Sequence, residues 1–193
     1  MNQNHPTDTL AQQRDVLQPL LDDHQVVRDV LASMERRVVD ERLGRAAANG
    51  FWQLVVEFFE GYASSVHHSF EDGRLLAELA RGGFAAPGSS ARIARQEHER
   101  MDPFLQHLRH AVRNGEPFEL RATVQAFVAL HRQHMDREES SVFPLLRAAI
   151  AREGCEEMLQ ELHFLETDAL GERAQSERVA DEVRRLSYSS RAH

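Results

Sequence analysis

The chain has 193 residues and a mass of 22.0 kDa, which suits one domain with a sizeable hydrophobic core. Its formal net charge of −8 argues against a nucleic-acid-binding protein, because no basic surface is left to neutralise phosphates. A single cysteine, Cys155, excludes an internal disulfide framework, and no signal-peptide pattern or membrane-spanning apolar run is present. We therefore expect a cytoplasmic protein with no nucleic-acid or membrane partner.

The apolar residues of the chain recur every three or four positions, which is the period of an amphipathic helix. Residues 1–14 lack this period, and we expect them to be disordered. Four long helices are predicted beyond them, at residues 17–38, 51–79, 90–113 and 117–152. Pro144 lies inside the fourth and can kink it, because its nitrogen carries no proton for the helical hydrogen bonds.

The predicted fold class is all-α. Four amphipathic helices with short connections favour an antiparallel up-and-down four-helix bundle over residues 15–152. A C-terminal helical extension and tail would occupy residues 153–193. Within it, a weaker helical stretch covers residues 156–170, and the charged run at residues 177–185 predicts a solvated helix face.

Six ionisable residues interrupt the apolar stripes of the four predicted helices. They are His24, His67, Glu71, His98, His134 and Glu138. Burying an imidazole or a carboxylate without a partner is costly, so residues on such stripes need one. Two histidine–glutamate pairs are spaced by four residues, which places each pair on one helix face, about 5–6 Å apart at Cβ. Each pair can therefore bind one ion or two neighbouring ions.

The ligand types narrow the choice of metal. Imidazole and carboxylate without thiolate favour iron, manganese or zinc over copper(I) or an iron–sulfur cluster, and two carboxylates able to bridge favour a two-metal site. A lone buried histidine is more often a core residue, and one His-x-x-x-Glu pair is often a surface contact. Six such residues on four helices are harder to explain without a metal.

Four stretches resemble the helices of bacterial hemerythrin-like (HHE) cation-binding domains. They are LLDDHQVVRDVLASME, VHHSFEDGRLLAEL, QEHERMDPFLQHL and HMDREESSVFPLL. The resemblance covers residues 16–150 and implies that the six residues named above bind two iron ions. It also implies that Glu71 and Glu138 bridge the irons beside an oxo or hydroxo group, and that the protein binds O₂, hydrogen peroxide or nitric oxide.

The sequence departs from the oxygen-carrying hemerythrins at two places. Those proteins have a second histidine on the third helix, where this chain has Asp102, and they space the last histidine and carboxylate by five residues instead of four. With four histidines, two octahedral irons keep about two open positions instead of about one. Candidates for a replacement ligand are His68, Asp102, His131, His163 and Glu166.

Several functions remain open at this level. The first is a binding or sensing module for O₂, iron or an oxidant, as a monomer or homodimer. The second is an enzyme with catalase-like or peroxidase-like activity, and the third is a structural metal-binding bundle. Neither Glu-x-x-His nor His-Glu-x-x-His occurs, which argues against a ferritin-like oxidase and against a zinc protease.

Overall fold

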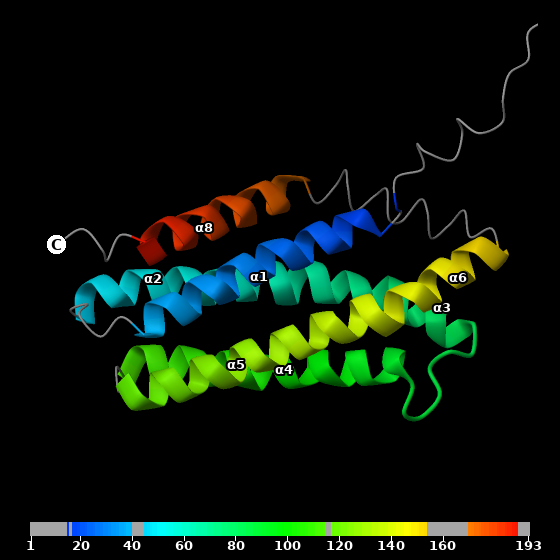
Figure 1. Ribbon diagram of the computed structural model, residues 1–193, viewed down its shortest axis with the longest axis horizontal. Coiled ribbons are helices and arrows are strands. Elements are labelled where there is room, and N and C mark those ends of the chain that lie inside the picture. Colours follow the sequence, from blue (N-terminus) through cyan, green and yellow to red (C-terminus); the bar gives the residue numbers. More distant parts are fainter. Residues whose placement is uncertain (1–14, 16, 40–44, 115–116, 154–169, 189–193) are drawn as a thin grey trace, which may run out of the picture.

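The computed structural model describes residues 15, 17–39, 45–114, 117–153 and 170–188, and the regular elements of these residues are all helical (Figure 1). This confirms the predicted all-α class. The elements in chain order are α1 (Gln18–Val39), α2 (Arg45–Phe58), η1 (Phe59–His68), η2 (Glu71–Leu75), α3 (Leu76–Arg81), α4 (Ser90–Asn114), α5 (Pro117–Arg137), η3 (Glu138–Val142), α6 (Phe143–Glu153) and α8 (Leu170–Tyr188). The three η segments are π-helical turns. Such turns are rare in proteins as a whole, but where they occur they are often at functional sites.

Two continuous rods contain these π turns. The first runs from α2 through η1 and η2 to α3, and the second from α5 through η3 to α6. Pro144 is the second residue of α6, so the irregularity expected at this proline is a π turn directly before it. The first rod begins at Arg45, earlier than the predicted start at Phe51, because the alanines before Gly50 favour helix and one glycine costs only about 1 kcal/mol.

The connection between α3 and α4 follows its glycines and serines. Gly83 and Gly88 have φ angles of 84° and 79°, a region that glycine enters without strain. The Ser89 hydroxyl accepts a hydrogen bond from the backbone N–H of Arg92 at 3.3 Å, which caps the first turn of α4. The predicted helix start after this glycine-rich connection is therefore confirmed.

α8 corrects the expectation for the C-terminal region. It packs against α1 and α2 (Figure 1). Val179, Ala180 and Val183 are buried in this contact, so the run at residues 177–185 is not simply a solvated face. Residues 156–169 of the weaker predicted helix lie outside the described residues.

The apolar core is divided into two clusters. One contains Val27, Tyr62, Leu105 and Phe127 among others, and the other contains Leu20, Leu75, Ala94, Val142 and similar residues. We count α1 and α4 as two further rods. On each of the four rods the candidate ligands lie, in sequence, between members of the two apolar clusters. A polar layer therefore crosses the interior of an otherwise apolar bundle.

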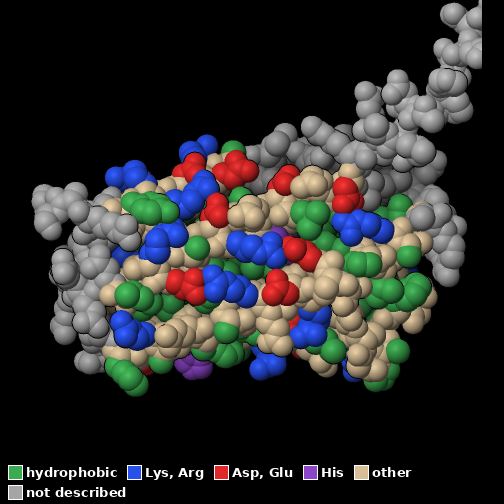
Figure 2. Space-filling model, in the orientation of Figure 1, with side chains coloured by type: hydrophobic (Ala, Val, Ile, Leu, Met, Phe, Trp, Pro, Cys, Tyr) green, Lys and Arg blue, Asp and Glu red, His purple; other side chains and the backbone are tan. Residues whose placement is uncertain are grey.

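The surface shows no concentration of one charge on the face in view. Arginine and acidic side chains alternate over α1 and its neighbours (Figure 2). Every helix in the described ranges is too short or too polar to cross a lipid bilayer.

Candidate metal centre

The six residues predicted as ligands all lie in the polar layer and are buried. Their exposed fractions range from 0% for His24 to 6% for His98. They form two groups that share both glutamates, and in each group the potential ligand atoms lie within 4.8 Å of one another. The groups are His24, His67, Glu71, Glu138 and Glu71, His98, His134, Glu138. We refer to the six residues as the ligand cluster.

The Nε2 atoms of all four histidines face the shared glutamates. His24 Nε2 is 3.3 Å and His134 Nε2 is 3.1 Å from the same oxygen of Glu138. His67 Nε2 and His98 Nε2 are each 3.4 Å from one of the two Glu71 oxygens. Glu71 therefore lies between two imidazoles, and Glu138 between two others.

The opposite nitrogen of each imidazole faces a further carboxylate. The contacts are His24 Nδ1 with Glu139 Oε1 at 2.8 Å, His67 Nδ1 with Asp23 Oδ2 at 3.3 Å, His98 Nδ1 with Asp72 Oδ1 at 3.0 Å, and His134 Nδ1 with Glu97 Oε2 at 3.4 Å. We call Asp23, Asp72, Glu97 and Glu139 the outer carboxylates. Such a carboxylate stabilises the proton on Nδ1, which leaves a lone pair on Nε2.

This arrangement puts several acceptors against one another in the middle of the bundle. The Nε2 atoms of His98 and His134 are only 3.0 Å apart, and both face carboxylate oxygens. His24 Nε2, both oxygens of Glu71 and one of Glu138 have no hydrogen-bond partner within the part of the chain that the structure describes. Lone pairs and carboxylate oxygens repel unless a cation lies among them, so the residues present fit a metal.

The pKa values of two histidines in the ligand cluster are raised by the carboxylates around them. Burial lowers the pKa of His24, but the adjacent carboxylates of Glu138 and Glu139 outweigh this effect and raise the pKa to about 9. Burial also lowers the pKa of His98, but Asp72 and Glu71 outweigh it and raise the pKa to about 10. A site that holds protons this firmly also attracts a metal cation, which would displace them.

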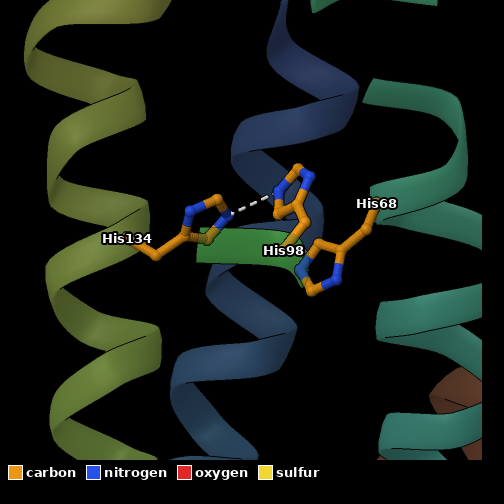
Figure 3. Close-up of side chains that lie close together, drawn as sticks. All are labelled: His68, His98 and His134. Carbon is orange, nitrogen blue, oxygen red and sulfur yellow. Dashed lines mark hydrogen bonds between the residues drawn. The ribbon is translucent and has the colours of Figure 1, made fainter. Parts of the chain in front are cut away.

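His68, at the end of η1, lies beside the ligand cluster. Its ligand atom lies within 4.8 Å of those of His98 and His134, and the three imidazoles converge from three helical segments (Figure 3). Its ring stacks on His98 with 4.3 Å between centroids. Burial, reinforced by His98 and the other neighbouring histidines, holds the pKa of His68 well below its usual range. The imidazole is therefore neutral and keeps a lone pair for a metal.

The π turns explain why adjacent histidines both point inward. In an α-helix successive residues are about 100° apart, and few adjacent pairs share one buried face. η1 ends with His67 and His68, while η2 and η3 begin with Glu71 and Glu138. The wider turns thus coincide with the positions at which the ligand cluster must converge.

The outer carboxylates were missed by the sequence analysis, although each is adjacent in sequence to a predicted ligand. Asp23 precedes His24, Glu97 precedes His98, Asp72 follows Glu71, and Glu139 follows Glu138. Each supports the histidine of the next rod, and the last returns to α1, so the four contacts close a ring around the bundle. An acidic neighbour at a ligand on every helix is the signal that could have revealed them.

Three of the outer carboxylates are in turn bound by arginines at the surface of the site. Arg28 is 2.8 Å from Glu139, and Arg137 is 2.9 Å from Glu97. The Arg95 guanidinium lies 3.6 Å from the Asp72 carboxylate and donates a hydrogen bond to its backbone carbonyl. The fourth, Asp23, accepts a hydrogen bond from the hydroxyl of Tyr62.

The remaining candidate ligands lie outside the ligand cluster or outside the described residues. Asp102 is exposed, so its expected position on the buried stripe of α4 was wrong. The buried stripe runs through His98, Met101 and Leu105, and Asp102 lies beside it. His131 is buried but belongs to none of the groups; its Nδ1 donates to the Phe127 carbonyl at 3.0 Å. Burial lowers the pKa of His131 to about 3. His163, Glu166 and Cys155 lie outside the described residues.

The comparison with known families agrees with this geometry. The sequence model of the hemerythrin HHE cation-binding domain matches residues 15–146, which is more than half of the chain. The chain belongs to this family. The resemblance noted in the sequence is thereby confirmed, and membership in the hemerythrin HHE family indicates a metal-binding helical domain with buried histidine and glutamate groups able to hold the metal. No curated protein and no solved structure matches the chain.

Proposed function

We propose that this hemerythrin HHE domain binds two iron ions in the ligand cluster and binds O₂ or a related small oxidant there. The observation that carries the proposal is the set of Nε2 lone pairs and carboxylate oxygens that face one another in the buried layer. Iron supplies the reversible one-electron chemistry that O₂, peroxide and nitric oxide require. We also propose the antiparallel up-and-down order of the four rods that the resemblance implies.

The two ions would differ in their ligands. One ion would be held by His24 and His67, and the other by His68, His98 and His134, with Glu71 and Glu138 bridging them. An octahedral ion accepts about six ligands, so with a bridging oxygen the second ion is complete and the first keeps about one position. In this assignment His68 replaces the histidine that the sequence lacks at Asp102. The small molecule would bind on the side of His24 and His67.

Metal analysis of the purified protein tests the assignment of the bridges. We expect close to two irons per chain, and less than one after Glu71→Ala or Glu138→Ala. Glu99→Ala, an exposed glutamate on α4, is the matched control and should keep both irons. A folded, metal-free native protein that is unchanged by the Glu71 and Glu138 substitutions would refute the proposal.

A peroxide-consuming activity is the second candidate function. The buried Tyr62 hydroxyl, connected through Asp23 to His67, offers the site an oxidisable group that simple O₂ carriage does not need. Adding hydrogen peroxide to the iron-loaded protein separates the two functions. Steady evolution of oxygen indicates turnover, whereas a stable spectrum of the oxygenated protein in air without turnover indicates binding.

A further inference from the structure

Tyr62 lies at the end of a hydrogen-bonded chain that leads into the ligand cluster. Its hydroxyl donates to one carboxylate oxygen of Asp23, and the other oxygen of Asp23 is 3.3 Å from His67 Nδ1. On the far side of that ring, His67 Nε2 is 3.4 Å from Glu71. A phenol, a carboxylate and an imidazole thus connect in sequence to the proposed metal bridge.

The π-helical geometry of η1 makes this connection possible. Tyr62 and His67 are five residues apart, which in an α-helix would place them about 140° apart around the axis. A π turn closes between residues i and i+5, so both side chains can face Asp23 on α1. The hydroxyl of Ser65 donates to the carbonyl of Glu60, five residues earlier, as expected for such a turn.

Tyr62, which donates to Asp23, differs in chemistry from the arginines that contact the other three outer carboxylates. Arg28, Arg95 and Arg137 are guanidinium groups, which stay protonated and do not give up electrons. A phenol can lose an electron when a base takes its proton at the same time. Asp23 is 5% exposed and Tyr62 is 1% exposed, so the base and the phenol meet away from solvent.

We propose that Tyr62 is an internal electron donor to the metal centre and becomes a neutral tyrosyl radical when the centre reacts with peroxide. The proposal rests on the proposed function, because it requires iron in the ligand cluster. Asp23 accepts the phenolic proton, and His67 provides the route by which the electron reaches the metal.

The electrons and protons balance for an iron pair with one ferrous and one ferric ion. Hydrogen peroxide takes up two electrons and two solvent protons, its O–O bond breaks, and two waters form. The ferrous ion gives one electron and becomes ferric, and Tyr62 gives the other. The O–H bond of Tyr62 breaks as an O–H bond forms on Asp23, which leaves a ferric pair, a protonated carboxyl group and a neutral radical.

The surroundings of Tyr62 suit a radical that persists long enough to be observed. The ring packs against Phe58 with 5.4 Å between centroids, inside the larger apolar cluster. A buried apolar environment keeps water and small reductants from the ring. The radical oxygen would retain the protonated Asp23 as a polar neighbour.

The chain offers a matched control, because its only other tyrosine is exposed. Tyr188 is 57% exposed at the end of α8, which contributes no residue to the ligand cluster. Iron-loaded protein is partly reduced to the mixed-valent state, mixed with hydrogen peroxide, frozen and measured by electron paramagnetic resonance. We expect an organic-radical signal with tyrosyl hyperfine structure in the native protein and in Tyr188→Phe, and its loss in Tyr62→Phe. Asp23→Asn should also lose the signal, since an amide cannot accept the proton.

Two further measurements separate the possible failures. Ring-deuterated tyrosine should narrow the hyperfine structure in the unsubstituted protein, which identifies the radical even if Tyr62→Phe folds poorly. Iron content is measured for every sample. A native protein with two irons and no radical, or a signal that persists in folded Tyr62→Phe, overturns this proposal alone. A native protein that binds no iron overturns the proposed function.

Discussion

His68 and His131 are both buried, neutral imidazoles, yet their nitrogens meet different partners. His131 lies between the rings of Phe59 and Phe127, at 4.9 Å and 4.2 Å between centroids, and donates from Nδ1 to a backbone carbonyl. His68 instead stacks on His98, a member of the ligand cluster. The first imidazole therefore fills the core, whereas the second belongs to a group of histidines that could hold a metal ion.

Substituting these two histidines should separate their roles. We predict that His68→Ala lowers the iron content to about one per chain or weakens binding at least tenfold, as the loss of a supporting ligand commonly does. His131→Phe should keep both irons, because a phenyl ring can occupy the same apolar site. Iron titration followed by absorbance measures both, and equal iron binding by native protein and His68→Ala would contradict the assignment.

An outer carboxylate should matter without touching the metal. Glu97 receives contacts from His134 and Arg137, and Glu97→Gln preserves its shape while removing its charge. We predict a loss of about 10–100-fold in iron affinity, because the carboxylate raises the basicity of the ligand that it supports. Isothermal titration measures the change. Glu99→Gln, two residues away and exposed, is the control and should bind iron like the native protein.

At the residue scale, helical register predicted the ligand cluster, whereas the outer carboxylates are explained only by contacts between neighbouring helices. The six residues of the ligand cluster were identified because charge on an apolar stripe requires a partner. The outer carboxylates lie just off those stripes, so register alone assigns them to solvent. Only the packing of neighbouring rods shows that Asp72 or Glu139 faces an imidazole from another helix.

At the scale of elements, the sequence predicted where helices occur better than what kind they are. The periods gave the bounds of α4, and those of the rod that runs from α5 through η3 to α6, within a few residues. The π turns were not predicted, because no residue preference marks them and an α-helical register fits most of the same positions. The adjacent inward histidines of η1 and the proline after η3 are the sequence features that accompany them.

Residues 177–185 of α8 were predicted to form a solvated helix face because charged side chains dominate this run. Val179, Ala180 and Val183 nevertheless pack on α1 and α2, and Arg184 binds Asp29 of α1 at 2.8 Å. Three small apolar residues among many charges produce a weak pattern. Their burial depends on a partner surface that only the folded bundle provides.

Disrupting this contact should destabilise the protein without removing the ligands. Val183→Asp places an unpaired charge in a fully buried position, and we predict a loss of about 3 kcal/mol or more in the free energy of unfolding. Arg178→Ala, at an exposed position of the same helix, should change it by less than about 0.5 kcal/mol. Urea unfolding compares the two. Similar midpoints for both variants would show that α8 adds little to the stability of the fold.

For the whole molecule, the ligand cluster is a polar layer between two apolar clusters. Without a cation its carboxylates and imidazoles face one another, so metal binding to the folded state is expected to contribute to stability. At iron concentrations a hundredfold above the dissociation constant, the contribution is about 2.7 kcal/mol.

Removing the metal should therefore lower the melting temperature. For a chain of this length each kcal/mol corresponds to about 2–4 °C, so we predict a decrease of about 5–10 °C on chelation. Differential scanning calorimetry with and without chelator measures it. The Glu71→Ala variant, which should bind little metal, provides the reference, and its melting temperature should not respond to chelator. An equal response in both proteins would indicate that the chelator acts elsewhere.

The closed ring of outer carboxylates has a mechanical consequence. Each of the four rods gives a carboxylate to one neighbour and receives one from another, so none can tilt or slide without straining two contacts. Loosening is thereby shared around the circumference, and the rods should open together instead of fraying one at a time. The ring thus connects all four rods around the bundle. A displacement of one imidazole by an arriving ligand would therefore be transmitted to all four helices.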